Sequence, residues 1–253
     1  VSAAPGAVAI ETADASDLTI AGNEFAVRKT GIDVHLERNV YDLSLRSNRI
    51  IGGTDGISVD HDPRADGFFS FALSVTENDL SGQSDSGFDL RTSLFSDATY
   101  AIRNNSVTDV GRYGLFLAVG ELKNAAITDN DVRETARSGV FVTARHVRDV
   151  SISHNTVREA GRSGIEITAR SVMERVHARD NELLDNAREG LAVRTGEATA
   201  ENYTVRDNVI AANAYGIALS GPQSVNLTGN AVVFNTVSIG ERIGRADAAT
   251  GIG

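Results

Sequence analysis

A glycine recurs every 25 to 31 residues along this chain, and each time an apolar residue, any residue and a second apolar residue follow it. These glycines are Gly31, Gly56, Gly87, Gly114, Gly139, Gly164, Gly190 and Gly216. We expect one earlier repeat in which Ala7 replaces the glycine and Val8 and Ile10 form the apolar pair. Internal repeats of this length are typical of solenoid proteins, in which each repeat is one unit stacked on the next. The repeat therefore predicts one continuous array of coils.

An asparagine marks a second position of the repeat, at Asn23, Asn48, Asn78, Asn105, Asn130, Asn155, Asn181, Asn208 and Asn230. An apolar residue follows two positions later, and an alternating apolar pair such as Val150 and Ile152 precedes it. Each repeat thus contains three short segments of period two, which indicates short strands separated by turns. We expect the asparagines to tolerate a left-handed backbone and to hydrogen-bond to one another, and the glycines to permit a sharp bend.

Such short strands are not stable in isolation, and the repeat leaves no room for a strand–helix unit. If the coils stack, equivalent strands pair in parallel at about 4.8 Å and their inward side chains form continuous aliphatic columns. The sequence therefore predicts an all-β fold, a single parallel β-helix of about nine coils with three short strands per coil. It is expected to cover residues 1–253 as one domain, with an irregular C-terminal tail at 240–253. The alternative, a leucine-rich solenoid, would contain a helical segment and be dominated by Leu, whereas Ile and Val dominate here.

The composition narrows the partners and the kind of core. The chain is 41% apolar but only 6% aromatic and has no Cys, so the core must be aliphatic and neither a disulfide nor a thiolate metal site can form. A net charge of −10, with acids and bases interspersed, argues against nucleic acid as the main partner. No apolar run is long enough for a membrane span. Because Met173 is the only Met and no signal peptide is found, we expect a module of a longer protein whose export signal lies elsewhere.

The Gly-Ile/Val and Asn-x-Ile/Val markers resemble the repeats of the pectate-lyase-like superfamily of right-handed parallel β-helices. That resemblance covers essentially the whole chain and implies a right-handed coil and a secreted bacterial protein. The superfamily includes polysaccharide lyases, polygalacturonase-type hydrolases, mannuronan C5-epimerases and noncatalytic surface proteins. The stretch Asp185-Asn-Ala-Arg-Glu-Gly190 looks most similar to the epimerases. Their Asp-Pro-His-Glu signature is absent, since Asp62-Pro63 is followed by Arg64 and preceded by His61.

Reactive side chains concentrate on the strands that follow the glycines. The fourth residue after each glycine should point outward, and this column reads Glu11, His35, Asp60, Arg91, Ala118, Thr143, Thr168, Arg194 and Ser220. Stacking would place His35, Asp60 and Arg91 side by side, with Asp33 and Asp89 flanking them on the same face. The longest repeat, between Gly56 and Gly87, adds His61, Asp62 and Arg64 in an insertion. Insertions in solenoids form loops, often on the binding face.

This cluster matches the requirements for acting on an acidic (uronate) polysaccharide by β-elimination or C5-epimerisation. His61 or His35 could remove the proton next to the carboxylate, because His titrates near neutral pH. Arg91 or Arg64 could offset the charge of the substrate, and Asp60 could raise the pKa of a neighbouring His.

Two alternatives stay open for the same residues. Asp60, Asp62 and Asp89 could instead serve a glycoside hydrolase that uses paired carboxyl groups. The other alternative is a salt-paired outer face of a noncatalytic glycan-binding or adhesin module. We expect no metal site and no required cofactor. Turn acids and asparagines could bind Ca²⁺, but the nonapeptide repeat that would support this is absent. The sequence does not indicate an oligomeric state.

A column of bases precedes the glycines by two residues, at Lys29, Arg112, Arg137, Arg162 and Arg188. Together with Tyr113, Phe116 and Phe141 as platforms for sugar rings, it could bind the carboxylates of a polyanion. We favour the alternative that these arginines pair with the acids five residues before each glycine, which are Asp109, Glu134, Glu159 and Asp185.

Overall fold

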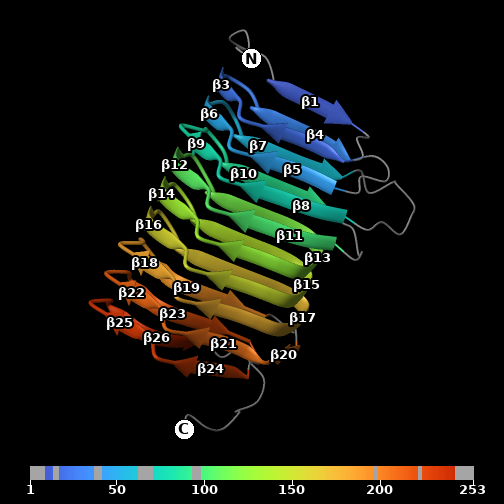
Figure 1. Cartoon of the computed structure of the whole chain (residues 1–253). Helices are drawn as coiled ribbons and strands as arrows, with labels where there is room; N and C mark the ends of the chain where they lie inside the picture. Colours follow the sequence, from blue (N-terminus) through green and yellow to red (C-terminus); the bar gives the residue numbers. More distant parts are fainter. Residues whose placement is uncertain are drawn as a thin grey trace.

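The computed structural model describes residues 9–13, 17–36, 42–61, 71–92, 98–195, 199–221 and 224–242. All regular elements in these ranges are β-strands, and the strand pairs are parallel. The strands form a 17-stranded and a nine-stranded sheet. Figure 1 shows the coils stacked in sequence order from β1 to β26, so each coil contacts mainly the coil before it and the coil after it. The predicted parallel β-solenoid of about nine coils is therefore confirmed.

The strands that follow the repeated glycine form the first ladder. Its members are β1 (Ile10–Ala13), β4 (Ile32–Leu36), β7 (Ile57–His61), β10 (Phe88–Thr92), β13 (Leu115–Thr128), β15 (Val140–Ser153), β17 (Ile165–Arg179), β19 (Glu189–Arg194), β23 (Tyr215–Ser220) and β26 (Val237–Arg242).

The strands that precede the asparagine form the second ladder. Its separate members are β2 (Leu18–Ala21), β5 (Asp42–Arg46), β8 (Phe71–Thr76), β11 (Ala98–Arg103), β21 (Tyr203–Arg206) and β24 (Val225–Thr228), and the short β20 (Thr199–Glu201) pairs with β17. In three central coils the first two strands run together into β13, β15 and β17, which are 14, 14 and 15 residues long. These long strands join the first and second ladders into the 17-stranded sheet.

The strands that follow the asparagine form the nine-stranded third ladder. Its members are β3 (Glu24–Val27), β6 (Arg49–Gly52), β9 (Asp79–Ser81), β12 (Ser106–Val110), β14 (Asp131–Thr135), β16 (Thr156–Ala160), β18 (Glu182–Leu184), β22 (Val209–Ala211) and β25 (Ala231–Val233). They stack along one edge of the solenoid in Figure 1.

Two boundaries differ from the sequence-based expectation. β26 extends to Arg242, so residues 240–242, expected in the irregular tail, belong to a strand, and the rest of that tail lies outside the described residues. In the first coil Ile10 pairs with Ile32, and Glu11 therefore lies beside Asp33 rather than beside His35. The predicted start of that coil was two residues too early, because Ala9, not Ala7, stands opposite Gly31.

Within the described ranges, no helix is long and apolar enough to cross a membrane.

The asparagines form a continuous hydrogen-bonded ladder, as predicted. The backbone N–H and the side-chain amide of Asn105 both donate to Oδ1 of Asn130, at 3.1 and 2.9 Å, and Asn130 does the same to Asn155. These side chains are about 1% exposed or less, so the ladder satisfies buried polar groups that would otherwise destabilise the turn. The left-handed conformation, however, occurs at the residue before each asparagine, for example at Asn104 and Asp129.

The repeated glycines are required by close packing rather than by a left-handed backbone, since none of them has a positive φ. A Cβ at Gly139 would lie 2.2 Å from Cγ1 of Val157 and 3.0 Å from the carbonyl oxygen of Gly164. The chain bends at most of these glycines, as expected, and the close packing adds a steric reason for the missing side chain. This packing brings the coils together around an aliphatic core in which the inward residues of all three ladders are buried.

Candidate functional site

The register brings together the three residues predicted to form the central cluster. Asp60 in β7 pairs with His35 in β4 on one side and with Arg91 in β10 on the other. Asp33 and Asp89 both stand opposite Ser58, two residues earlier on the same face. Because these strands are short and extended, alternation points all five side chains away from the core.

His35 lies between two carboxylates. Its Nδ1 is 2.5 Å from Oδ1 of Asp60, and its Nε2 is 3.5 Å from Oδ2 of Asp33. The side chains of His35 and Asp60 are 41% and 45% exposed, whereas that of Asp33 is 20% exposed. The imidazole is therefore held in one orientation but remains open to a ligand.

The charges around His35 change its proton affinity. Burial opposes the charged imidazole, but Asp60 and Asp33 together outweigh it, so the pKa of His35 is raised above its usual 6.5. Burial also raises the pKa of Asp33, and repulsion from Asp60 and Glu11 adds to this effect, although His35 and a hydrogen bond with Ser58 oppose it. Both shifts reduce the negative charge at this end of the face, but its three acids, Glu11, Asp33 and Asp60, still outnumber the one base, His35.

Arg91 is bound to a partner other than Asp60. Its Nε and Nη2 donate to the two carboxylate oxygens of Asp89 at 2.9 and 2.8 Å, and its guanidinium lies 5.0 Å from the ring centre of Phe116. The Asp89 side chain is only 6% exposed, while that of Arg91 is 56% exposed. The guanidinium thus folds back along its own strand, although the backbones of Arg91 and Asp60 are paired.

The predicted insertion lies mostly outside the described residues. Asp62 and Arg64 fall in the range 62–70, which the structure does not describe. His61 ends β7, but only its backbone is described. The roles predicted for these three residues therefore remain predictions.

The predicted aromatic platform is a packed cluster and not an exposed surface. Tyr113 stacks on Phe116 and Phe141 with ring centres 4.9 and 5.1 Å apart. Tyr113 and Phe116 are 7% and 9% exposed, and only Phe141 is partly accessible. The guanidinium groups of Arg112 and Arg137 lie 5.3 and 5.8 Å from the Tyr113 ring and help to cover it.

The favoured pairing of the basic column with the turn acids is wrong for the described residues. Arg112 instead donates to Asp85 at 3.1 Å, and Arg137 donates to the hydroxyl of Tyr113 at 3.3 Å. The acids adopt the left-handed conformation at the turn, at Asp109, Glu134, Glu159 and Asp185. Short Asp and Asn side chains tolerate this conformation better than most, which accounts for Asp109 and Asp185 without an ion pair, whereas it does not account for the two glutamates.

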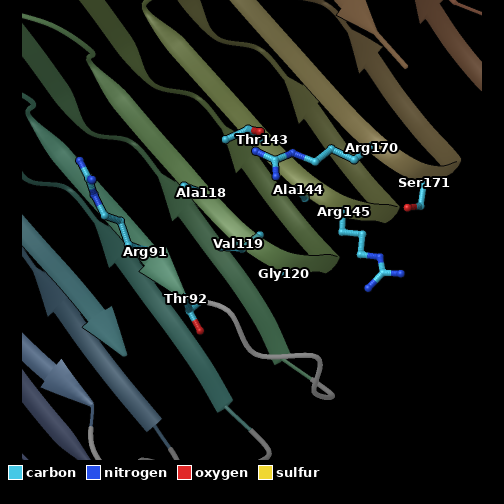
Figure 2. Close-up of a pocket in the computed structure, with 10 residues that line it drawn as sticks. All are labelled: Arg91, Thr92, Ala118, Val119, Gly120, Thr143, Ala144, Arg145, Arg170 and Ser171. Atoms are coloured by element: carbon cyan, nitrogen blue, oxygen red, sulfur yellow. The ribbon is translucent and has the colours of Figure 1, made fainter. Parts of the chain in front are cut away.

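An open groove of about 650 Å³ continues the same outward face beyond Arg91. Figure 2 shows its floor of small side chains, including Ala118, Gly120 and Ala144, surrounded by three arginines. These are Arg91 from β10, Arg145 from β15 and Arg170 from β17. The outward column that holds Asp60 and Arg91 continues in the next two coils with Ala118 and Thr143. These side chains are smaller, and the space that they leave forms the groove.

Three groups of residues on or near this face were not predicted from the sequence. Arg145 and Arg170 escaped notice because they lie after the short predicted strand, in segments that prove to be continuous with it. Asp55, in the turn before β7, accepts a hydrogen bond from the Ser86 N–H at 3.0 Å. Burial and the carboxylates of Asp89 and Asp85 raise the pKa of Asp55 to about 6, against the opposing effects of that bond and of Arg91.

The third missed group is an ionic network around Arg194 in β19. Arg194 donates to Glu166 at 3.0 Å and to Glu189 at 3.2 Å, and Ser138 and Ser163 donate to the same two carboxylates. The Glu189 side chain is 7% exposed, and because these bonds outweigh burial its pKa is lowered. Both carboxylates are fully engaged, which indicates a structural role.

Asp33, His35 and Asp60 are also the described residues best placed to hold a metal ion, since one ligand atom of each lies within 4.8 Å of the others. Imidazole and carboxylate donors would suit a divalent transition metal. Asp60 and Asp33 already contact His35, however, and the geometry is equally accounted for by a protonated imidazole between two carboxylates.

Comparison with known proteins gives one match. The family described as a right-handed beta helix region matches residues 34–203, the larger part of the chain. This range contains His35, Asp60, Arg91 and the whole groove, and it agrees with the predicted handedness. No curated protein and no solved structure gave a significant match.

Proposed function

The chain belongs to the right-handed β-helix family, and on that premise we propose that it acts on an acidic polysaccharide bound along the outward face of the first ladder. One observation carries the proposal. A histidine held by a carboxylate and a groove surrounded by arginines lie on the same face, in consecutive coils. Polymers of uronate units combine carboxylates, which arginines bind, with a proton next to a carbonyl, which a base can remove.

In the proposed reaction His35 is the base. The shorter contact, between Nδ1 and Asp60, favours the neutral tautomer that carries its hydrogen on Nδ1 and leaves the lone pair on Nε2, which lies 3.5 Å from Asp33. Nε2 takes the proton from the carbon next to the carbonyl, and the electron pair left behind is delocalised into that carbonyl. Reprotonation of that carbon by solvent from the opposite side then gives the epimer. In the lyase reaction the bond between the neighbouring carbon and its glycosidic oxygen breaks instead, which leaves a double bond in the sugar, and the departing oxygen takes a proton from solvent to become a hydroxyl. Both reactions share this first step.

The hydrolase alternative has less support among the described residues. It requires two carboxyl groups that flank a glycosidic bond and are free to exchange protons. Asp89 is nearly buried and bound through both oxygens to Arg91, so it cannot serve as the partner of Asp60.

Incubation of the chain with alginate, polygalacturonate and neutral glycans tests the proposal. An increase in ultraviolet absorbance would report the unsaturated product of a lyase, and altered proton NMR signals without chain cleavage would report an epimerase. His35→Asn should abolish either reaction. The matched control is His154→Asn, because His154 also contacts a carboxylate, 3.7 Å away on Asp180, but lies in a turn outside the groove. Unchanged turnover by His35→Asn, or new reducing ends without unsaturation, would contradict the proposed mechanism. Binding without turnover would identify a glycan-binding module.

A further inference from the structure

The two ends of this outward face carry opposite charge. The groove over β10 to β17 is lined by three arginines and, among its described residues, by no carboxylate. Arg170 is exposed and has no ion-pair partner in the described part of the chain. Arg91 is already neutralised by Asp89. Arg170 is therefore the clearest cation available to a bound ligand.

The other end, over β4 and β7, is acidic. Asp33 and Asp60 lie on either side of the single base His35, and Glu11 stands directly beside Asp33 in the neighbouring strand. Two carboxylates thus contact the imidazole, and a third lies one strand further along the same face. The nearest arginine in register, Arg91, directs its guanidinium to Asp89. A sugar unit with a free carboxylate placed here would meet like charge without a compensating cation.

Resting on the proposed function, we infer that the preferred polymer is only partly acidic. Units with free carboxylates lie over the arginine groove, and the unit that reaches His35 carries its carboxyl group in an uncharged form, as an ester. An ester carbonyl delocalises the electron pair left by proton removal without bringing a negative charge of its own. The base can therefore act at this position without a cation beside it. A uniformly charged polyuronate is repelled at one end of the face, and a fully esterified one loses its contacts with the arginines.

Turnover of polymers with graded ester content tests this inference. Polygalacturonate and alginate series of equal chain length would be prepared without methyl esters, with intermediate esterification and with complete esterification. We expect the highest kcat/KM at intermediate esterification in the series that the protein accepts. Highest activity on the ester-free polymer would overturn the inference while leaving the proposed function intact. If no preparation is bound or turned over, the proposed function is overturned, and the inference with it.

Two variants separate the contributions of the two ends. Arg170→Gln should lower kcat/KM on the intermediate polymer by roughly tenfold, the effect of losing one charge-assisted hydrogen bond, with little change on the fully esterified one. Asp33→Asn should move the optimum toward polymers with fewer esters. Arg179→Gln is the matched control, because Arg179 lies on the same strand but in the second ladder, away from the groove. An Arg170→Gln variant equally impaired on all polymers would contradict the assigned role of this arginine.

Discussion

Two outward side chains that stand opposite each other on neighbouring strands do not always contact each other. Asp60 is paired in register with both His35 and Arg91, yet it contacts only the histidine, because Arg91 makes a two-pronged interaction with Asp89 on its own strand. Such planar pairing is favoured for a guanidinium and a carboxylate. The charge on His35 is therefore set by Asp60 and Asp33 rather than by Arg91.

At the residue scale, this arrangement predicts the pH dependence of the proposed reaction. A base must be neutral to accept a proton, so kcat/KM should fall as the pH drops below the raised pKa of His35. Asp60→Asn removes the carboxylate that raises this pKa most, so the acidic limb of the profile should move to lower pH. The pH–rate profile of Asp180→Asn, which alters the carboxylate beside His154, serves as control and should match that of the native chain. An acidic limb that stays in place in Asp60→Asn would show that His35 is not the titrating base.

At the scale of the strand, the repeated glycines let the backbone before each strand of the first ladder pack directly against core side chains of the third ladder and against the backbone of the next coil. The carbonyl oxygen of Gly164 and Cγ1 of Val157 both lie within 3.0 Å of the position that a Cβ on Gly139 would occupy. Val157 is completely buried in β16. Neither neighbour can move away without displacing a whole coil, because backbone and core are both packed there.

Gly139→Ala should therefore lower the free energy of unfolding by about 2–3 kcal/mol, as expected for overpacking of a filled core. Adding Val157→Ala removes the closer of the two clashes, so the double variant should lose less than the sum of the single losses. Gly240→Ala is the control in the same ladder, because its Cβ would meet nothing closer than 3.5 Å. Chemical denaturation measures the free energy of unfolding of the native chain, the single variants Gly139→Ala and Val157→Ala, the double variant and the control. Strict additivity, or a loss in Gly139→Ala no larger than in the control, would argue against steric packing as the reason for the glycine.

For the whole molecule, stability depends on contacts between neighbouring coils, since each coil of a solenoid touches only the adjacent ones. The central strands β13, β15 and β17 are long and pair along nearly their full length. The last described coils are different, because large apolar side chains are exposed there. These are Val209, Tyr215, Val233, Phe234, Val237 and Ile239, with Phe234 at 91%.

We accordingly expect a gradient of backbone protection along the rod. In hydrogen–deuterium exchange, amides of β24, β25 and β26 should exchange much faster than those of β13 and β15, because opening the terminal coils exposes little additional apolar surface. Mass spectrometry of peptic fragments resolves these segments. Equal protection at both places would mean that the solenoid unfolds as one cooperative unit.

The periodic features of the molecule could be predicted from the sequence because they arise from one local pattern repeated in every coil. The first ladder, its inward columns, the asparagine ladder and the pairing of His35 with Asp60 all follow from the spacing of glycines and asparagines. The error at the first coil arose where the marker glycine is missing and Ala9 takes its place.

The tertiary structure alone decided which side chains contact one another and where space is left between them. The burial of Phe116 beneath Arg91, the two contacts of His35 and the groove lined by Arg91, Arg145 and Arg170 depend on rotamers chosen among neighbours on adjacent strands and coils. A repeat pattern specifies the direction of a side chain from its backbone but not its partner. The partner depends on which nearby charge, ring or vacant volume gives the most favourable contact once the coils are stacked.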